Sequence, residues 1–319
     1  MLNSSTGPTT ASTRDAPGRR PRTGRAFSYR TGRSLAPYFY VAPSFVLFAV
    51  IMVFPMIVAI RYSFLDRAIL SPDPSFVGLE NFATIFRDDT FWISVRNTLY
   101  FTFMSVVFHL GVGLLFAVLL NSGRVNPVLR SILRILYIMP WLFTPVIIAI
   151  VWRLLLDPVG VVNSMLTAVG IVARNVEWFS STDTAIHALT FVNIWAGFPL
   201  FMVSLLAGLQ GVPEELYEAA DMDGANEVRQ FRHITIPHLL PIIVSIVLLD
   251  FIWTMQVFPL VWMTTGGGPI HATEMLSTYT YKLAFSRYQF SLASASAIVV
   301  LALSMAVTWF YIRHQRASY

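Results

Sequence analysis

The 319-residue sequence contains no cysteine and a single lysine, Lys282, and charged residues make up only 12% of it. The absence of cysteine excludes disulfide bonds and cysteine-ligated metal sites. No G-x-x-x-x-G-K-[ST] segment is present, so any ATP used with this chain must be bound by another protein. H-E-x-x-H and G-x-S-x-G segments are absent too, and the chain is not predicted to be an enzyme.

Apolar residues, in contrast, make up 55% of the sequence, and the mean hydropathy of +0.63 indicates a polytopic membrane protein. The net charge of +5 lies in the N-terminal tail, because residues 1–36 hold seven arginines and only one acid. This tail is rich in Ser, Thr, Pro, Gly and Arg. We therefore expect residues 1–36 to be a disordered basic cytoplasmic tail.

Six apolar segments are long enough to cross a membrane, since a helix needs about 20 residues to cross about 30 Å of hydrocarbon. The predicted spans are residues 37–61, 97–121, 134–153, 185–210, 238–262 and 289–312. The predicted fold class is all-α, with one transmembrane domain over residues 37–312 and a short cytoplasmic C-terminus at 313–319. Pro140, Pro145 and Pro199 fall in or near spans and predict kinked helices.

The distribution of Lys and Arg predicts the orientation of these spans. Fourteen of the 22 basic residues lie in the N-terminal tail, in the loop after the second span, in residues 213–237 and at the C-terminus. Basic residues accumulate on the cytoplasmic side of membrane proteins. We therefore expect both termini and residues 213–237 to be cytoplasmic.

The polar stretch from Pro213 to Pro237 carries six of the 17 acidic residues. Pro213 suits the first turn of a helix, and the glutamates that follow it place negative charge at the positive end of the helix dipole. Gly224 gives the backbone freedom for a bend. A second short amphipathic helix is expected from about residue 225 to 234.

The first of these helices carries Ala219 and Ala220 beside Glu218, a narrow ridge that would fit a groove of another protein. This Glu-Ala-Ala segment, Gly224 after three residues, and Ile-Thr-Ile-Pro after nine more resemble the EAA signature of binding-protein-dependent ABC importer permeases. In that family the loop is the coupling helix, which docks in a cleft of a separate cytoplasmic ATPase. The resemblance implies ATPase coupling by Glu214, Glu218, Ala219, Ala220, Asp223, Gly224, Phe231 and Pro237.

Other segments resemble the carbohydrate-uptake branch of this family, so that the resemblance covers residues 37–312. They are PEELYEAA at 213–220, FVGLENF at 76–82, GVVNSML at 160–166 and TTGGGP at 264–269. The resemblance implies a multi-pass permease in the inner membrane of a prokaryote. It also implies a second homologous permease, two ATPase subunits that bind ATP and Mg, and an extracytoplasmic solute-binding protein, with no cofactor in this chain.

Asp250 is an acidic residue within a predicted span, about 20 Å along its helix, and such residues are usually functional. Trp253 and Gln256 follow at three-residue steps and share a broad face with it. A carboxylate, an indole and an amide suit a sugar, because hydroxyls meet the polar groups and the apolar sugar face stacks on the ring. The alternative is that Asp250 only joins helices by hydrogen bonds.

Asn193 and Trp195 in the fourth span are further candidates for the substrate pathway. Trp141 and Thr144 in the third span are also candidates for this pathway. The alternative is that they only pack helices together. His109 is interpreted as a satisfied polar residue of the bundle. The predicted substrate is therefore a sugar or small oligosaccharide, moved by alternating access that a separate ATPase drives.

Three other functions are weighed. The same branch includes permeases for glycerol-3-phosphate, and a polyol of this kind is an alternative, although the absence of a deep Lys or Arg favours a neutral substrate. A secondary transporter would use Asp250 as a proton or sodium site. A membrane glycosyltransferase would hold a metal with Asp221 and Asp223, but neither of these two classes explains the EAA spacing.

Overall fold

The computed structural model describes residues 36–122 and 126–315, and the predicted tail at 1–35 lies outside them. The described part of the chain divides into two units between Ile51 and Met52. The helices of the described residues are α1 (Ala36–Phe48), η1 (Ala49–Val53), α2 (Phe54–Ser63), α3 (Glu80–Phe86), α4 (Asp89–Asn121), α5 (Pro127–Leu142), α6 (Pro145–Leu155), α7 (Val161–Ala168), α8 (Ala185–Gln210), α9 (Glu214–Met222), α10 (Glu227–Gln230), η2 (Phe231–Thr235), α11 (Ile236–Met255), α12 (Pro259–Thr264), α13 (Leu276–Tyr281), η3 (Lys282–Ser286) and α14 (Phe290–Gln315). These residues form no strand beyond one isolated bridge, which confirms the all-α prediction.

Five helices of the described residues are long and apolar enough to cross a membrane, and a bent pair would make a sixth span. The five are Tyr40–Ser63, Asp89–Asn121, Ala185–Gln210, Glu227–Met255 and Phe290–Trp309. They correspond to five of the six predicted spans. The fold is therefore that of a multi-pass helical membrane protein.

The predicted third span, residues 134–153, is not one helix. It is α5 and α6, bent by 102° at Phe143 and Thr144. Pro145 has no N–H for a helical bond and disfavours helical geometry at Thr144 before it, which takes an extended conformation. Pro145 therefore marks a break, while Pro140 lies inside α5, where the sequence predicted a kinked but continuous span.

The predicted fifth span, residues 238–262, also ends early, at Met255. Gln256 is the C-cap, and α12 begins three residues later at Pro259, which again disfavours a helical residue before it. At the other end the helix begins at Glu227, because Asn226 accepts a hydrogen bond from the Arg229 backbone N–H and caps it. The expected separate helix at 225–234 is thus the first part of this span.

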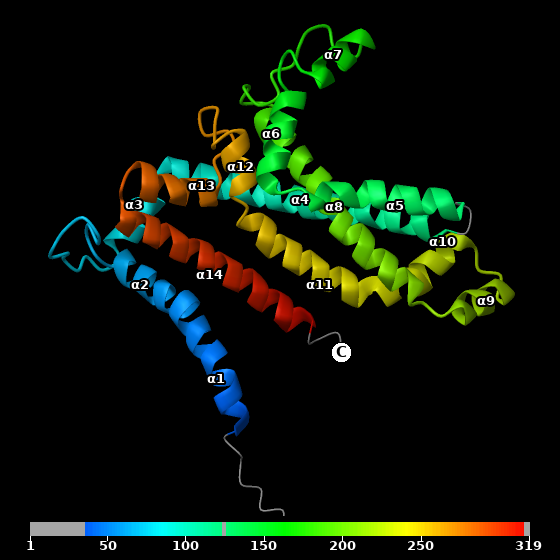
Figure 1. Ribbon diagram of the computed structural model, residues 1–319, viewed down its shortest axis with the longest axis horizontal. Coiled ribbons are helices and arrows are strands. Elements are labelled where there is room, and N and C mark those ends of the chain that lie inside the picture. The colour runs from blue at the N-terminus through cyan, green and yellow to red at the C-terminus, as the bar shows by residue number, and fades with distance from the viewer. Residues whose placement is uncertain (1–35, 123–125, 316–319) are drawn as a thin grey trace, which may run out of the picture. The chain divides into compact units, whose positions relative to one another are not determined.

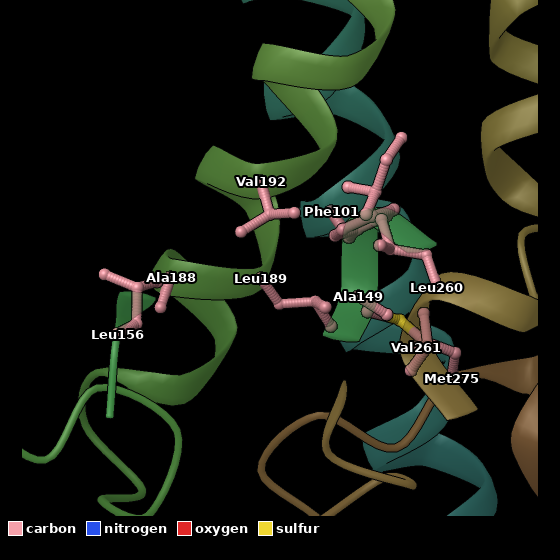
Figure 2. Packing of buried hydrophobic residues seen from close by; sticks show 10 residues of the cluster. Phe101, Ala149, Leu156, Ala188, Leu189, Val192, Leu260, Val261 and Met275 are labelled. Atoms are coloured by element: carbon pink, nitrogen blue, oxygen red, sulfur yellow. The ribbon is translucent and has the colours of Figure 1, made fainter. Parts of the chain in front are cut away.

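The bundle of the second unit is built on α4 and α8, which lie side by side with α11 against both (Figure 1). One apolar cluster joins these three helices and includes Ala117, Phe201, Leu205 and Leu239. A second cluster joins α4 and α8 to α6 and α12, and Figure 2 shows Phe101, Ala149, Leu189 and Leu260 meeting there. Burial of these side chains holds α4, α6, α8, α11 and α12 together.

The loop after α12 is bound to the first half of α4. Asn97 Nδ2 donates to the carbonyl oxygens of His271, Ala272 and Glu274, each at 3.1 Å. The Glu274 carboxylate is almost fully buried and is paired with Lys282. Buried charges need partners, so the ion pair between Glu274 and Lys282 is favourable. This ion pair and the three hydrogen bonds from the Asn97 side chain hold α12 and α13 on one end of the bundle.

The opposite end of the bundle carries α9, which lies beyond α8 as a short separate helix (Figure 1). Pro213 is its N-cap, and Glu214 and Glu215 lie in the first turn, as predicted. Gly224 follows with a φ of +72°, a conformation that residues with a side chain rarely adopt. The predicted bend at Gly224 is therefore confirmed.

Candidate functional site

A buried pair of ionisable side chains joins α4 to α11. His109 Nδ1 lies 2.8 Å from Asp250 Oδ2, and both residues are buried. His109 is 20 residues into the 33-residue α4, well inside the longest helix of the bundle. Asp250 lies five residues before the end of α11. The pair is therefore a contact between two spans, deep in the helical part of the protein.

The hydrogen bonds of His109 determine the net charge of this pair. His109 Nε2 lies 3.0 Å from the carbonyl oxygen of Asn193, which can only accept, so Nε2 carries a proton. Two acceptors cannot face each other at 2.8 Å, so one further proton lies between Nδ1 and the carboxyl group. The pair is either imidazolium with carboxylate or imidazole with carboxylic acid. Its net charge is zero in both arrangements.

Three further polar groups extend this contact. Asn193 of α8 donates from Nδ2 to Ser105 Oγ at 2.9 Å, and Thr254 Oγ1 donates to Asp250 Oδ1 at 3.3 Å. A Cβ atom at Gly197 would lie 2.3 Å from His109 Nε2, so only glycine leaves room for the imidazole. The resulting network fixes the relative positions of α4, α8 and α11.

The pair lines a cavity of about 300 Å³ between α8, α11 and the break of α5 and α6. Pro140, Trp141, Phe143 and Pro145 line it from the broken span. Irregular backbone inside a membrane domain is tolerated where it lines a cavity, since its polar groups can be solvated there. The bend between α5 and α6 thus forms one wall of this pocket.

Two indole rings are available in the pocket. Trp141 and Trp253 both line it and are 53% and 58% exposed, so neither ring is used up by packing within the chain. Asn193, Asp250 and Thr254 supply polar atoms to the same cavity. An apolar pocket with a few polar groups and free aromatic rings is typical of a site for a small polyhydroxylated molecule.

The structure brings together Asp250, Trp253 and Asn193 of the predicted pathway residues, and Trp141 with them. It places two others elsewhere. Gln256 is the exposed C-cap of α11, and Trp195 packs edge-on against Trp152 with ring centroids 5.4 Å apart. Thr144 caps α6 by accepting a hydrogen bond from the Ile147 N–H.

The residues predicted to couple to an ATPase form an exposed surface. α9 has no buried residue, and among the predicted set Ala220 and Phe231 are half-buried while the others are exposed: Glu214, Glu218, Ala219, Asp223, Gly224 and Pro237. Met222 is 89% exposed and adds an apolar side chain. The outer face of α9 is therefore not covered by the rest of the described chain.

The structure agrees with the interpretation of His109 as a satisfied polar residue, since both ring nitrogens have partners. Sequence reasoning missed that its partner is Asp250, and it missed Ser105 and Thr254. A signal was present, because an ionisable residue within one span is expected to pair with one in another span, but two other histidines also lie in predicted spans, His187 and His238. The described residues hold no group of three or more His, Asp or Glu side chains placed to bind a metal ion.

Comparison with known proteins agrees with this architecture. A family model described as the inner membrane component of binding-protein-dependent transport systems matches residues 109–317. The sulfoquinovosyl glycerol transport permease SmoG of Agrobacterium fabrum is 35% identical, over 88% of this chain and 91% of that protein. The trehalose/maltose transport permease MalF of Thermococcus litoralis is 31% identical, over 86% and 92%.

A solved structure has the same fold. It is a chain of a bacterial ABC transporter involved in the import of the acidic polysaccharide alginate, with a TM-score of 0.78 at 23% identity. The match covers 89% of this chain and 96% of that one. The extent of the family match and the identity to these permeases together show that this chain belongs to the inner membrane components of binding-protein-dependent ABC transport systems.

Proposed function

We propose that this permease passes a neutral sugar or short oligosaccharide across the inner membrane, and that the pocket around His109 and Asp250 is part of the pathway. Several similar permeases are named for carbohydrates. Two of them are the trehalose/maltose and sulfoquinovosyl glycerol permeases. A third is the arabinooligosaccharide transport permease AraP of Bacillus subtilis, which is 32% identical over 86% of this chain and 87% of that protein.

The observation that carries the proposal is the combination of two exposed indoles with a neutral polar pair. Trp141 and Trp253 offer ring faces to the apolar faces of a sugar, while Asp250 and Asn193 offer hydrogen-bonding atoms to its hydroxyls. His109 and Asp250 are the only ionisable residues among those lining the pocket, and they bind each other.

The same observation favours a neutral substrate. A phosphate group is commonly bound by an Arg or Lys side chain, and neither lines this pocket. Glycerol-3-phosphate is therefore disfavoured. A proton- or sodium-coupled transporter and a glycosyltransferase are not proposed, because the chain belongs to a family of ABC transport components. The Asp221 carboxylate, moreover, accepts a hydrogen bond from Gln230.

The energy for transport comes from a partner protein that hydrolyses ATP. We infer that α9 docks on a cytoplasmic ATPase through Glu218, Ala219 and Ala220, and that ATP and Mg are bound there. A second permease and an extracytoplasmic binding protein would complete the transporter, with both termini of this chain in the cytoplasm. Closure of the ATPases would move α9 and open the pathway outward, so that one rigid-body motion drives another.

The test begins with co-purification of the tagged full chain in detergent, followed by mass spectrometry of the accompanying proteins. We expect wild type and Glu80→Lys to bring an ATPase and a second permease, and Glu218→Lys to lose the ATPase. Glu80 is a matched control because it is exposed on α3, at the other end of the bundle.

The purified complex is then reconstituted in liposomes with its binding protein. Uptake of labelled maltose, trehalose and arabinose oligosaccharides is compared with uptake of glycerol-3-phosphate and an alginate oligosaccharide. The proposal predicts ATP-dependent uptake of a neutral sugar. Exclusive uptake of an anionic compound, or a wild-type chain that purifies without an ATPase, would contradict it.

A further inference from the structure

The backbone on both sides of α9 is irregular. Before it, Gly211 and Val212 form a turn that ends at Pro213, whose ψ of 132° is not helical. After it, Gly224 has positive φ. Turn residues of this kind absorb rotations at hinges. Because no unbroken helix joins α9 to the spans on either side, a movement of α9 must reach them through other contacts.

Two side-chain hydrogen bonds attach α9 to the first turns of the next span. Tyr217 Oη and Thr235 Oγ1 are 2.9 Å apart, and Gln230 Nε2 donates to Asp221 Oδ1. Tyr217 and Asp221 are four residues apart and lie on one face of α9. Thr235 is buried and Tyr217 is half-buried, so the hydrogen bond between them is partly shielded from water. One face of α9 is therefore bound to η2 and α10, while Glu218 on another face stays exposed.

The ends of α4 and α8 are less closely associated with α9. A cavity of about 550 Å³ is lined by Asn121 of α4, Leu209 of α8, Tyr217 of α9 and Thr235 of η2. Across it, Tyr217 and Thr235 are joined by a hydrogen bond between their side chains. Open space transmits no displacement, because side chains that are not in contact cannot push on one another. The hydrogen bond to Thr235 is thus a direct link from α9 to the transmembrane bundle.

Thr235 belongs to the same continuous helix as the pocket. Residues Glu227–Met255 form one helix that includes η2, where Ile236 N–H donates to the Phe231 carbonyl five residues earlier. Asp250 lies 15 residues beyond Thr235, about 22 Å along the axis. A displacement of the Thr235 end therefore reaches the Asp250–His109 contact along one continuous helix, which contains Pro241.

We propose that Thr235 and Tyr217 are positioning residues for transport, and that their hydrogen bond transmits movement of α9 to α11 and hence to the Asp250–His109 contact. This rests on the proposed function, since α9 must be driven by an ATPase. Neither residue touches the substrate pocket. Their proposed role is to couple ATP hydrolysis by the partner to the transport of solute.

The test uses three single variants in the reconstituted full transporter. Thr235→Val keeps the shape of the side chain and removes the hydroxyl group, Thr235→Ser keeps the hydroxyl group, and Tyr217→Phe removes only the phenolic oxygen. Solute uptake and ATP hydrolysis are measured on the same samples, and ATPase co-purification is measured in detergent. The quantity compared is solute transported per ATP hydrolysed.

We expect Thr235→Val and Tyr217→Phe to keep the bound ATPase and its hydrolysis, and to lower transport per ATP by about two- to tenfold, the equivalent of one hydrogen bond. Thr235→Ser should match wild type. The double variant Tyr217→Phe/Thr235→Val should be no worse than either single variant, because both remove the same bond.

Unchanged transport per ATP in Thr235→Val and Tyr217→Phe would overturn the proposal. So would a parallel loss of hydrolysis, uptake and bound ATPase, because that is the result of a structural defect in α9. Failure of the proposed function would be recognised separately, in the wild-type protein, as the absence of an ATPase or of solute-stimulated hydrolysis, and it would overturn this proposal as well.

Discussion

His109 and Asp250 are 141 residues apart in the sequence, and their side chains meet at 2.8 Å between α4 and α11. The contact explains how an acidic residue is kept inside the bundle of a membrane protein, since the pair as a whole carries no net charge. The arrangement makes each partner dependent on the other. The first prediction follows from this dependence.

We predict that His109→Ala is strongly destabilising, by about 3–5 kcal/mol, because it leaves the buried carboxyl group of Asp250 without its partner and removes a buried side chain. Asp250→Asn should cost less, since a neutral imidazole remains. The double variant His109→Ala/Asp250→Asn should be more stable than His109→Ala alone. The measurement is the thermal unfolding midpoint in detergent, and additive effects of the two substitutions would argue against a coupled pair.

A second prediction concerns the space beside the imidazole. Gly197→Ala should destabilise the protein by about 1–3 kcal/mol, because the added methyl group would displace His109. Gly111→Ala is the matched control, since no atom lies within 4 Å of a Cβ at that position of α4. Equal unfolding midpoints for the two variants would show that His109 has more room than the structure gives it.

Orientation is tested by cysteine labelling, for which a chain without cysteine is well suited. Val128 and Val159 are 68% and 83% exposed, and they lie at the start of α5 and in the loop between α6 and α7. We predict that Val159→Cys reacts with an impermeant maleimide in intact spheroplasts and that Val128→Cys reacts only after permeabilisation. The reverse pattern would invert the proposed orientation.

A fourth prediction concerns Asp88, the N-cap of α4, which lies just before the span. Burial opposes its ionisation, but hydrogen bonds from Tyr279 Oη and the Thr90 N–H outweigh burial and hold the pKa of Asp88 below its ordinary value of 3.8. Burial and the nearby carboxylate raise the pKa of Tyr279, which therefore stays protonated and donates. Since the pKa of Asp88 is lowered on folding, the stabilisation is present above the ordinary value and is lost as the pH falls through the folded one.

Tyr279→Phe should therefore lower the unfolding midpoint at about pH 7, and the difference from wild type should shrink as the pH falls below about 4. The measurement is thermal unfolding in detergent across this range. A difference that is constant with pH would mean that Tyr279 contributes by packing alone.

Much of the fold could be predicted because it depends on local composition. Apolar length located the spans, and Pro213 and Gly224 located α9, since the proline ring fixes φ at its own position and the missing Cβ of glycine permits a positive φ. The break between α5 and α6 could not be distinguished from a kink. Proline in a membrane helix allows both, and the surrounding helices decide between them.

The site was predicted in part for a similar reason. Asp250 and Trp253 could be placed together because they share one helix, and spacing along a helix is visible in the sequence; Asn193 was a candidate on a different span. Their relation to His109 and Trp141 depends on how three spans pack, which no spacing records. The GVVNSML segment at 160–166 has a structural role, because buried Asn163 donates to the carbonyl oxygens of Asp157 and Val176.

The proposed transport pathway runs through the pocket around Asp250, and transport by pocket variants tests it most directly. Initial uptake of the neutral sugar is measured in proteoliposomes for wild type, Trp141→Ala and Trp253→Ala. Trp309→Ala is the control, because Trp309 is equally exposed but lies on α14, away from the pocket. We predict at least about a tenfold loss of uptake for each pocket variant, the equivalent of roughly 1.4 kcal/mol of stacking, and uptake close to wild type for the control. Uptake by Trp141→Ala and Trp253→Ala that equals the control would show that the sugar passes elsewhere.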